Sequence, residues 1–227
     1  MEYKKTGTIY LKVTRKSMAA SNDFFRGSDP ENTNRGSLEG HFLISETELT
    51  DPNFIQTVVY LVEHNDNGAL GFVVNRKSET ALKDVIPDFT DSPAGELEVY
   101  IGGPVEQMFL FTLHSGLPGD KRSDAASSSL QGVILEPDFE LIRRFLSEQW
   151  PDLNPEHRPE IRFYAGYAGW APGQLENELR HGAWVVIPAT PGIVFAPEPE
   201  ESWRNALRKK GGIYWVVAET GFKPSMN

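Results

Sequence analysis

The sequence predicts an α+β fold: a layered, mostly antiparallel or mixed sheet with a central, doubly buried hairpin, flanked by about four helices. Three observations predict it. Two nearly continuous apolar runs enclose a turn signal, further apolar runs follow towards the C-terminus, and apolar stripes of helical spacing lie elsewhere in the chain. Because strands without polar alternation are covered on both faces, helices or a second sheet must enclose this one.

The central hairpin joins the runs TVVYLVEH at 57–64 and ALGFVVN at 69–75. Asn65-Asp66-Asn67-Gly68 lies between them, and an Asn-Gly pair tolerates the positive φ angles of a tight hairpin. The runs AWVVIP at 183–188 and IYWVVA at 213–218 have the same doubly apolar character. We therefore expect both to be strands, together with shorter ones at 98–101 and 162–165.

Four segments carry helix signals: 80–86, 137–149, 172–182 and 201–212. Pro137 and Pro172 suit the first turn of a helix, and Gly182 can end one in the left-handed conformation. Trp203, Ala206 and Leu207 share one helical face. The basic residues that follow them suit the negative end of the helix dipole better than a nucleic-acid patch.

The length of 227 residues fits one domain with an appendage. Residues 1–39 are expected to form an N-terminal arm or linker, and residues 40–227 a single domain. Thr8–Val13 favours a short edge strand in the arm, and a homo-oligomer that uses this arm is an open alternative. The chain has no long apolar segment and no secretory signal, which predicts a cytoplasmic protein without a membrane anchor. The absence of cysteine excludes disulfides, thiolate catalysis and sulfur-ligated metals.

The formal net charge is −10, and it is unevenly distributed. Residues 1–40 carry 7 basic and 5 acidic side chains, whereas the remainder carries 15 basic and 27 acidic ones. Proteins bind nucleic acid by neutralising phosphates with Lys and Arg, so this acidity opposes direct DNA binding.

The stretch RFYAGYAGWAPGQLENELRHGAWVV at 162–186 combines glycines with large aromatic residues. Residues 166–173 are predicted as a tight passage from strand to helix, with two interpretations. In the first, the passage is a packed structural corner built by these residues: Gly166, Tyr167, Gly169, Trp170 and Pro172. In the second, residues 169–174 form a ligand loop at a helix N-terminus. We favour the corner, because the loop contains no charged catalytic group.

Three stretches together resemble the bacterial YqgE/AlgH family: DPNFIQTVVYLVEHNDNGALGFVVNR at 51–76, YIGGPV at 100–105 and GYAGWAPGQLENEL at 166–179. The resemblance covers about residues 40–222. It implies an α+β fold with a partly barrel-like sheet flanked by helices, and the family label of transcriptional regulator, which rests on association. Two features depart from the family pattern: the extension at 1–37, and Lys77, which stands where a proline generally follows Asn-Arg.

No catalytic or cofactor motif occurs: there is no nucleophile elbow, Walker loop, dinucleotide fingerprint or paired-histidine zinc motif. His41, His64 and His114 fall near predicted strand ends, where they could form a metal site with Glu63 or Asp51. Neighbouring strand residues point to opposite faces, so Glu63 and His64 would need a bulge to share one site. We therefore expect structural histidines, no metal and no cofactor.

Five residues are candidates for contact with a ligand or partner: Asn75, Arg76, Gly102, Gly103 and Gln174. Each lies beside a stretch that carries the resemblance, at a strand end or a helix start. Each also has a structural alternative. Arg76 could pair with a carboxylate, Asn75 and Gln174 could satisfy turn amides, and Gly102-Gly103-Pro104 could reverse the chain rather than bind an anion.

The leading hypothesis is a non-enzymatic protein that acts through a protein partner or a small ligand, as an indirect regulator of gene expression. One alternative is an enzyme, hydrolytic or nucleotide-directed, with a site near Asn75, Arg76, the Gly102–Pro104 loop and Gln174. The other alternative is a direct DNA-binding regulator. The charge opposes the last of these.

Overall fold

The computed structural model describes residues 36–119 and 130–224; the arm and the strand expected at Thr8–Val13 lie largely or wholly outside these ranges. The described strands are β1 His41–Ser45, β2 Val58–Asn65, β3 Gly68–Val73, β4 Lys77–Ala81, β5 Glu98–Ile101, β6 Val105–His114, β7 Ile134–Glu136, β8 Ile161–Trp170 and β9 Trp184–Pro188. The described α-helices are α2 Leu82–Val85, α3 Phe139–Glu148, α4 Gln174–Arg180, α5 Pro191–Val194, α6 Ser202–Lys210 and α7 Ile213–Thr220.

The strands form one mixed sheet in the order β4-β5-β8-β3-β2-β1-β9, and β6 pairs with both β8 and β7. β5 runs parallel to β8, and the other described pairs are antiparallel. In the described part of the chain β4 and β9 end this order without pairing with each other, so the sheet is open rather than closed into a barrel. The predicted α+β class is confirmed.

The central hairpin is also confirmed. Asn65 pairs with Gly68, which leaves Asp66 and Asn67 as a two-residue turn. Every residue of β3 is buried, as the continuous apolar run predicts. A β-bulge between Leu61 and Glu63 shifts the register on β2.

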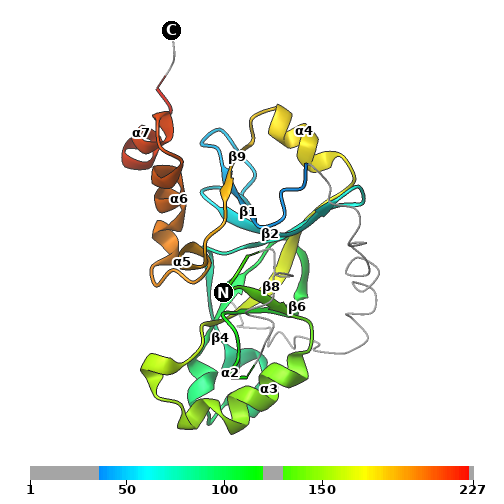
Figure 1. Ribbon diagram of the computed structural model, residues 1–227, viewed down its shortest axis with the longest axis vertical. Helices are drawn as coiled ribbons and strands as arrows, with labels where there is room; N and C mark the ends of the chain where they lie inside the picture. The colour runs from blue at the N-terminus through cyan, green and yellow to red at the C-terminus, as the bar shows by residue number, and fades with distance from the viewer. Residues whose placement is uncertain (1–35, 120–129, 225–227) are drawn as a thin grey trace, which may run out of the picture.

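β8 connects three hydrophobic cores that the described residues form. Phe163 packs into the core beneath α2 and α3, Tyr164 into the core under α5 to α7, and Trp170 into the core under α4. Figure 1 shows α4 above the hairpin, α5 to α7 along one side of the sheet, and α2 with α3 at the opposite end. Alternation places the neighbours Phe163 and Tyr164 on opposite faces, and Trp170 lies beyond Gly166, where a positive φ interrupts the alternation.

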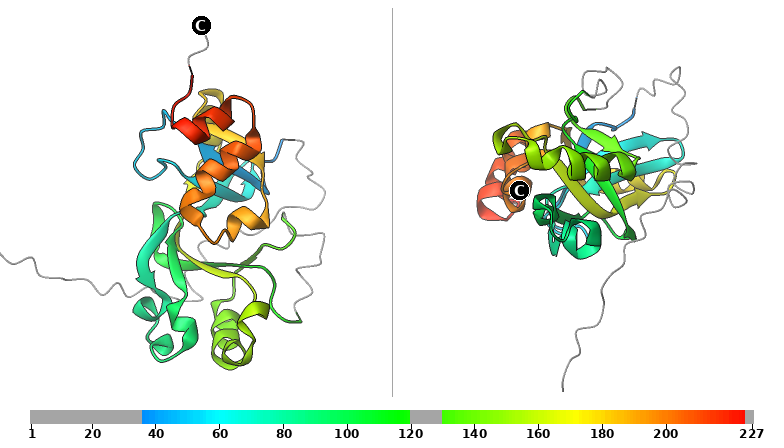
Figure 2. Two further views of the ribbon diagram at one scale, coloured as in Figure 1. Left: turned by 90° about the vertical axis from the view of Figure 1, so that its left-hand side faces the viewer. Right: turned by 90° about the horizontal axis from the view of Figure 1, so that it is seen from below.

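The predicted amphipathic helices bury the expected faces. α3 begins after Asp138, whose side chain accepts a hydrogen bond from the Glu140 amide, and α6 buries the face that contains Trp203. Figure 2 shows α6 and α7 covering the β1 and β9 side of the sheet. No helix among the described residues is long and apolar enough to cross a membrane.

Three predicted elements need correction. The run 213–218 lies in the helix α7 rather than in a strand. A short apolar run fits the period of a helix as well as that of a strand. Gly212 and Gly221, which both have positive φ, lie at the two ends of this helix. The passage at 166–173 is shorter than predicted, since β8 continues to Trp170. Pro137 and Pro172 each lie two residues before their helices, outside the first turn.

Candidate functional site

The loop between β1 and β2 is held by Asn75 and Arg76, which follow the buried Val74 just after β3. Asn75 accepts a hydrogen bond from the Val58 amide through Oδ1 (2.8 Å) and donates one from Nδ2 to the Gln56 carbonyl oxygen (2.9 Å). Both ends of its side-chain amide are therefore used on the same stretch of backbone. Asn75 fixes where the loop ends and β2 begins.

Arg76 holds the same loop closer to its middle. Its guanidinium donates to the carbonyl oxygens of Asn53 (2.9 Å) and Ile55 (3.3 Å). Burial lowers the pKa of Arg76, and the nearby carboxylate of Asp51 partly opposes this effect. The flat, multi-donor guanidinium suits contact with several carbonyl groups at once. Arg76 thus contacts backbone where the sequence suggested a carboxylate or a ligand.

The loop held in this way presents one apolar side chain to solvent. Ile55 is 49% exposed. Its neighbour Gln56 has φ of 51°, in the left-handed region that non-glycine residues rarely occupy. Such a conformation costs about 1–2 kcal/mol and persists where the surroundings impose it, here through the bond from Asn75. We call residues 51–57 the clamped loop.

An aromatic cluster supports the clamped loop from the α4 side. The ring of Phe54 lies 6.3 Å from that of Trp170 and 5.4 Å from that of Trp184, centroid to centroid. Both indoles donate a hydrogen bond from Nε1 to Oε2 of Glu178, at 2.9 and 2.7 Å. One carboxylate therefore fixes two rings on which the loop rests.

Gln174 belongs to this support. Its Oε1 accepts from the Ala171 amide (3.1 Å), and its Nε2 donates to Oε1 of Glu178 (2.9 Å). The sequence suggested Gln174 as a contact residue, whereas its polar groups here bind the turn before α4 and orient Glu178. The sequence analysis assigned Glu178 no role. Its position one helical turn after Gln174 is the signal that could have found it.

Gly102 and Gly103 allow two backbones to cross. A Cβ on Gly102 would lie 2.2 Å from the Gly166 carbonyl oxygen, and one on Gly103 would lie 2.2 Å from the Tyr167 carbonyl carbon. The Gly102 amide donates to the Ala165 carbonyl oxygen (2.9 Å), so it is not free to bind an anion. This arrangement supports the structural interpretation of the Gly-Gly-Pro turn.

The remaining corner residues lie along the end of β8 and just after it. The Tyr167 ring packs edge-on against that of Phe111. A Cβ on Gly169 would lie 3.1 Å from the Tyr167 ring, which is tight. Pro172 is exposed in the turn between β8 and α4. Backbone proximity and ring packing thus account for the glycines of this stretch.

The three histidines considered as metal ligands have separate partners. His41 bonds to the Glu39 carbonyl oxygen, and His64 accepts from the Leu38 amide at Nδ1 (2.9 Å). His64 Nε2 lies 2.8 Å from Oε1 of Glu176, which assigns the Nε2 proton to this contact. No group of three or more His, Asp or Glu residues that could hold a metal occurs in the part of the chain described.

The two carboxylates considered with them also serve local structure. Glu63 accepts a hydrogen bond from Nδ2 of Asn65 (2.7 Å) in the hairpin. Asp51 accepts from the Asn53 amide (2.9 Å), which makes the turn expected at the start of the clamped loop.

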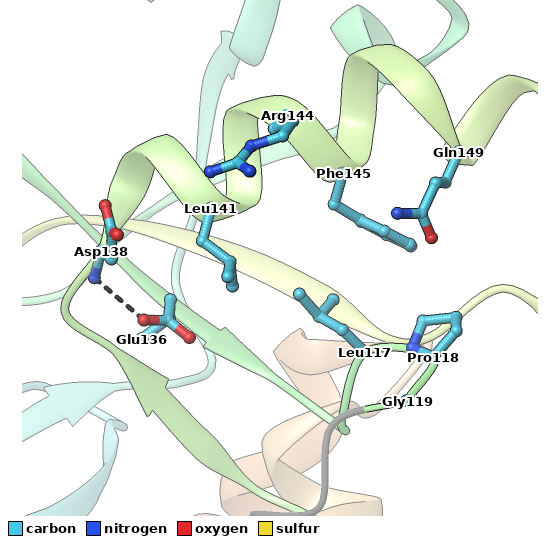
Figure 3. Close-up of a pocket in the computed structure, with 9 residues that line it drawn as sticks. All are labelled: Leu117, Pro118, Gly119, Glu136, Asp138, Leu141, Arg144, Phe145 and Gln149. Carbon is cyan, nitrogen blue, oxygen red and sulfur yellow. Dashed lines mark hydrogen bonds between the residues drawn. The ribbon is translucent and has the colours of Figure 1, made fainter.

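A pocket of about 540 Å³ lies between α3 and the segment after β6, and no sequence motif pointed to it (Figure 3). Its described lining is Leu117, Pro118, Gly119, Glu136, Asp138, Leu141, Arg144, Phe145 and Gln149. Glu136 accepts from the Asp138 amide (2.9 Å), and its Oε2 lies 3.6 Å from Nε2 of the buried His114. None of these lining residues is a serine, threonine, lysine or cysteine nucleophile.

Comparison with known proteins gives a consistent family assignment. A family model described as AlgH-like (DUF179) matches residues 42–215. A UPF0301 protein from Streptomyces coelicolor is 36% identical over 198 residues, which cover 86% of this chain and 98% of the relative. A UPF0301 protein from Chlorobium luteolum is 36% identical over 190 residues, covering 83% and 94%. These names state no activity.

Two solved structures share the fold. The solution structure of the AlgH protein from Pseudomonas aeruginosa has a TM-score of 0.60 and 32% identity, covering 88% of this chain and all of that one. The crystal structure of the protein DIP2367 from Corynebacterium diphtheriae has a TM-score of 0.62, covering 81% and 92%. Because its sequence identity to this chain is 24%, this similarity shows a shared fold alone.

Proposed function

The chain belongs to the AlgH-like family, and from that premise we propose that it binds a protein partner in the cytoplasm through the clamped loop and catalyses no reaction. One observation carries the proposal. The stretches 51–76 and 166–179, which carry the family resemblance, both contact this loop. Asn75 and Arg76 hold its backbone, and Trp170, which Glu178 fixes, packs against the ring of Phe54.

The result of this convergence is a rigid support for an exposed apolar side chain. Loops that a scaffold holds in place are frequent recognition elements. Ile55 is available for contact while the residues around it are fixed, so its ordering costs little when a partner covers it. A regulatory effect would then be indirect, through the partner.

Catalysis is the less favoured alternative. The polar groups of Asn75 and Gln174 are all hydrogen-bonded within the protein, and the guanidinium of Arg76 contacts backbone carbonyl groups. A catalytic site needs a nucleophile, a base and a group that orients the base within hydrogen-bond reach. Asn75 and Arg76 are here directed at the clamped loop, and Gln174 is directed at Ala171 and Glu178.

The test compares two exposed apolar residues on different elements. Ile55 is 49% exposed on the clamped loop, and Met108 is 50% exposed on β6. Full-length Ile55→Asp, Met108→Asp and wild-type proteins are used to capture partners from the native cell. Each captured protein is identified by mass spectrometry, purified, and its Kd is measured against all three proteins.

We expect Ile55→Asp to weaken binding at least tenfold, as for an anchor residue worth more than about 1.4 kcal/mol, and Met108→Asp to leave the Kd unchanged. Both variants should melt within a few degrees of the wild type, since both positions are exposed. Equal affinity of all three proteins for every partner would contradict the proposal. So would a substrate turned over by the purified chain.

A further inference from the structure

The first six residues of α7, Ile213 to Ala218, are all apolar, but they are covered on only one side. Val217 and Ala218 are buried against the core, and the Tyr214 hydroxyl donates to Oε1 of Glu46 (2.9 Å). On the other side Trp215 is 54% exposed, and Phe222, just past the helix, is 78% exposed. A helix that is apolar all round is normally buried on all sides.

The same region is basic in an otherwise acidic protein. Residues 202–224 contain five basic side chains and one acidic one, whereas residues 41–227 as a whole carry 15 and 27. We call α6, α7 and the residues to 224 the C-terminal hairpin. Its charge is therefore opposite in sign to that of the body that carries it.

Three of these five cations form ion pairs. Arg204 pairs with Glu201 (2.9 Å), Arg208 with Glu219 (2.7 Å), and Lys223 with Glu46 (3.1 Å).

The remaining two cations adjoin the start of α7. Lys210 donates to the Val186 carbonyl oxygen (3.2 Å). Lys209 is exposed and has no carboxylate within 4 Å in the described part of the chain. Two lysines without a carboxylate partner thus lie close in sequence to the exposed Trp215.

We propose that the C-terminal hairpin is a docking surface for an acidic, apolar segment of a protein partner. Apolar side chains of that segment cover Trp215 and Phe222, and its carboxylates face Lys209 and Lys210. Aromatic side chains bury about 150–250 Å² each, so these two supply the apolar centre of an ordinary protein interface of about 800 Å² per side. The surface is separate from the clamped loop.

Charge favours this partner over other occupants. A second copy pairing hairpin to hairpin would bring two basic surfaces together. Nucleic acids and anionic membranes need several phosphate contacts, whereas two cations of the hairpin, Lys209 and Lys210, have no carboxylate partner among the described residues, on a chain of net charge −10. A peptide with a few carboxylates matches the number of available cations.

The experiment selects peptides on the whole protein. A display library of random 16-residue peptides is selected on the full-length chain and counter-selected on the full-length Phe222→Ser, Lys209→Glu double variant. The enriched peptides should combine Asp or Glu with Leu, Ile, Phe or Trp. Enrichment without an acidic bias, or no enrichment over the counter-selected protein, would overturn the proposal.

Binding of the most enriched peptide is then measured by fluorescence anisotropy. Trp215→Ser and Phe222→Ser should each weaken it at least tenfold, and Lys209→Glu should weaken it less and reduce its dependence on salt. Ile55→Asp should leave it unchanged, which separates this surface from the clamped loop. Phe222 is exposed enough that its variant tests binding even if Trp215→Ser fails to fold.

Three further arms test the other occupants. These are a 20-base-pair duplex DNA, vesicles of 30% phosphatidylglycerol in phosphatidylcholine, and sedimentation equilibrium of the chain alone. The proposal predicts no effect of Trp215→Ser or Lys209→Glu in any of them. DNA binding, vesicle binding or self-association that these substitutions abolish would assign the hairpin to that occupant and overturn the proposal.

Discussion

Glu178 and Asn75 show how single polar side chains organise this part of the protein. Glu178 receives both indole donors and the Gln174 amide, and Asn75 binds two backbone positions at once. Removal of either side chain would leave its hydrogen-bond partners unpaired: the two indole N–H groups and the Gln174 amide for Glu178, and the Val58 amide and the Gln56 carbonyl oxygen for Asn75. At the residue scale, the stretches that carry the family resemblance contain residues that hold a loop.

The Asn75→Ala substitution should lower the free energy of unfolding by about 1–3 kcal/mol, because the buried Val58 amide loses its acceptor. Urea unfolding measures the change. Asn177→Ala, at an exposed helical position, is the matched control and should stay within about 0.5 kcal/mol of the wild type. An Asn75→Ala protein as stable as the control would mean that the bond at Val58 does not hold the loop.

Two buried tyrosines predict a loss of stability at high pH. Burial raises the pKa of Tyr100 to about 12 and raises that of Tyr164 as well, while the charge of Arg162 opposes both shifts. The unfolded chain releases these protons near pH 10, whereas the folded protein keeps them. The stabilisation is therefore complete below about pH 10 and is lost as pH rises towards the folded-state pKa.

Each tyrosine should contribute a slope of up to about 1.4 kcal/mol per pH unit above pH 10. Urea unfolding between about pH 9 and pH 12 measures this slope. Tyr100→Phe and Tyr164→Phe should each make it shallower. An unchanged slope in both variants would show that neither hydroxyl is protected in the folded protein.

At the scale of elements, β8 links the two parts of the sheet. Its residues 161–165 pair with β5 and β6, and its residues 168–170 pair with β3. Gly166 lies between these two segments with φ of 71°, and a Cβ there would come within 2.5 Å of the Val105 carbonyl oxygen. A left-handed residue thus lets one strand serve two parts of the sheet.

Gly166→Ala should therefore cost about 3–5 kcal/mol, since it combines left-handed strain with a clash against backbone. Gly173→Ala is the matched control: its φ is 74°, but nothing lies within 4 Å of the added carbon. It should cost about 1–2 kcal/mol, the conformational part alone. The loss is measured by thermal or urea unfolding. If both variants lost the same free energy of unfolding, close approach of the Val105 backbone would not be the reason that position 166 needs glycine.

The spacing of apolar residues and the residues typical of turns predicted most helices and strands. The hairpin followed from continuous apolar runs around Asn-Gly, and α3 and α6 followed from their apolar stripes. α7 could not be predicted in this way, because six apolar residues fit a strand or a helix equally well. The glycines after α6 and α7, not the apolar run, mark its ends.

At the scale of the whole molecule, the candidate site was less predictable than the fold. Asn75, Arg76 and Gln174 were found by their place beside the motifs, but their partners lie far along the chain or in the turn before α4. A sequence does not show whether a polar side chain faces a ligand or a backbone carbonyl group. The pocket beside α3 depends on packing between distant segments and had no motif.

Amide hydrogen–deuterium exchange of the full-length chain, with and without a partner captured as described above, tests the clamped loop as the binding surface. The account predicts that the partner slows exchange in peptides covering residues 49–57, while those covering 136–149 beside the pocket stay unchanged. Exchange at 49–57 that is the same with and without saturating partner would contradict it, above all if protection appeared at 136–149 instead.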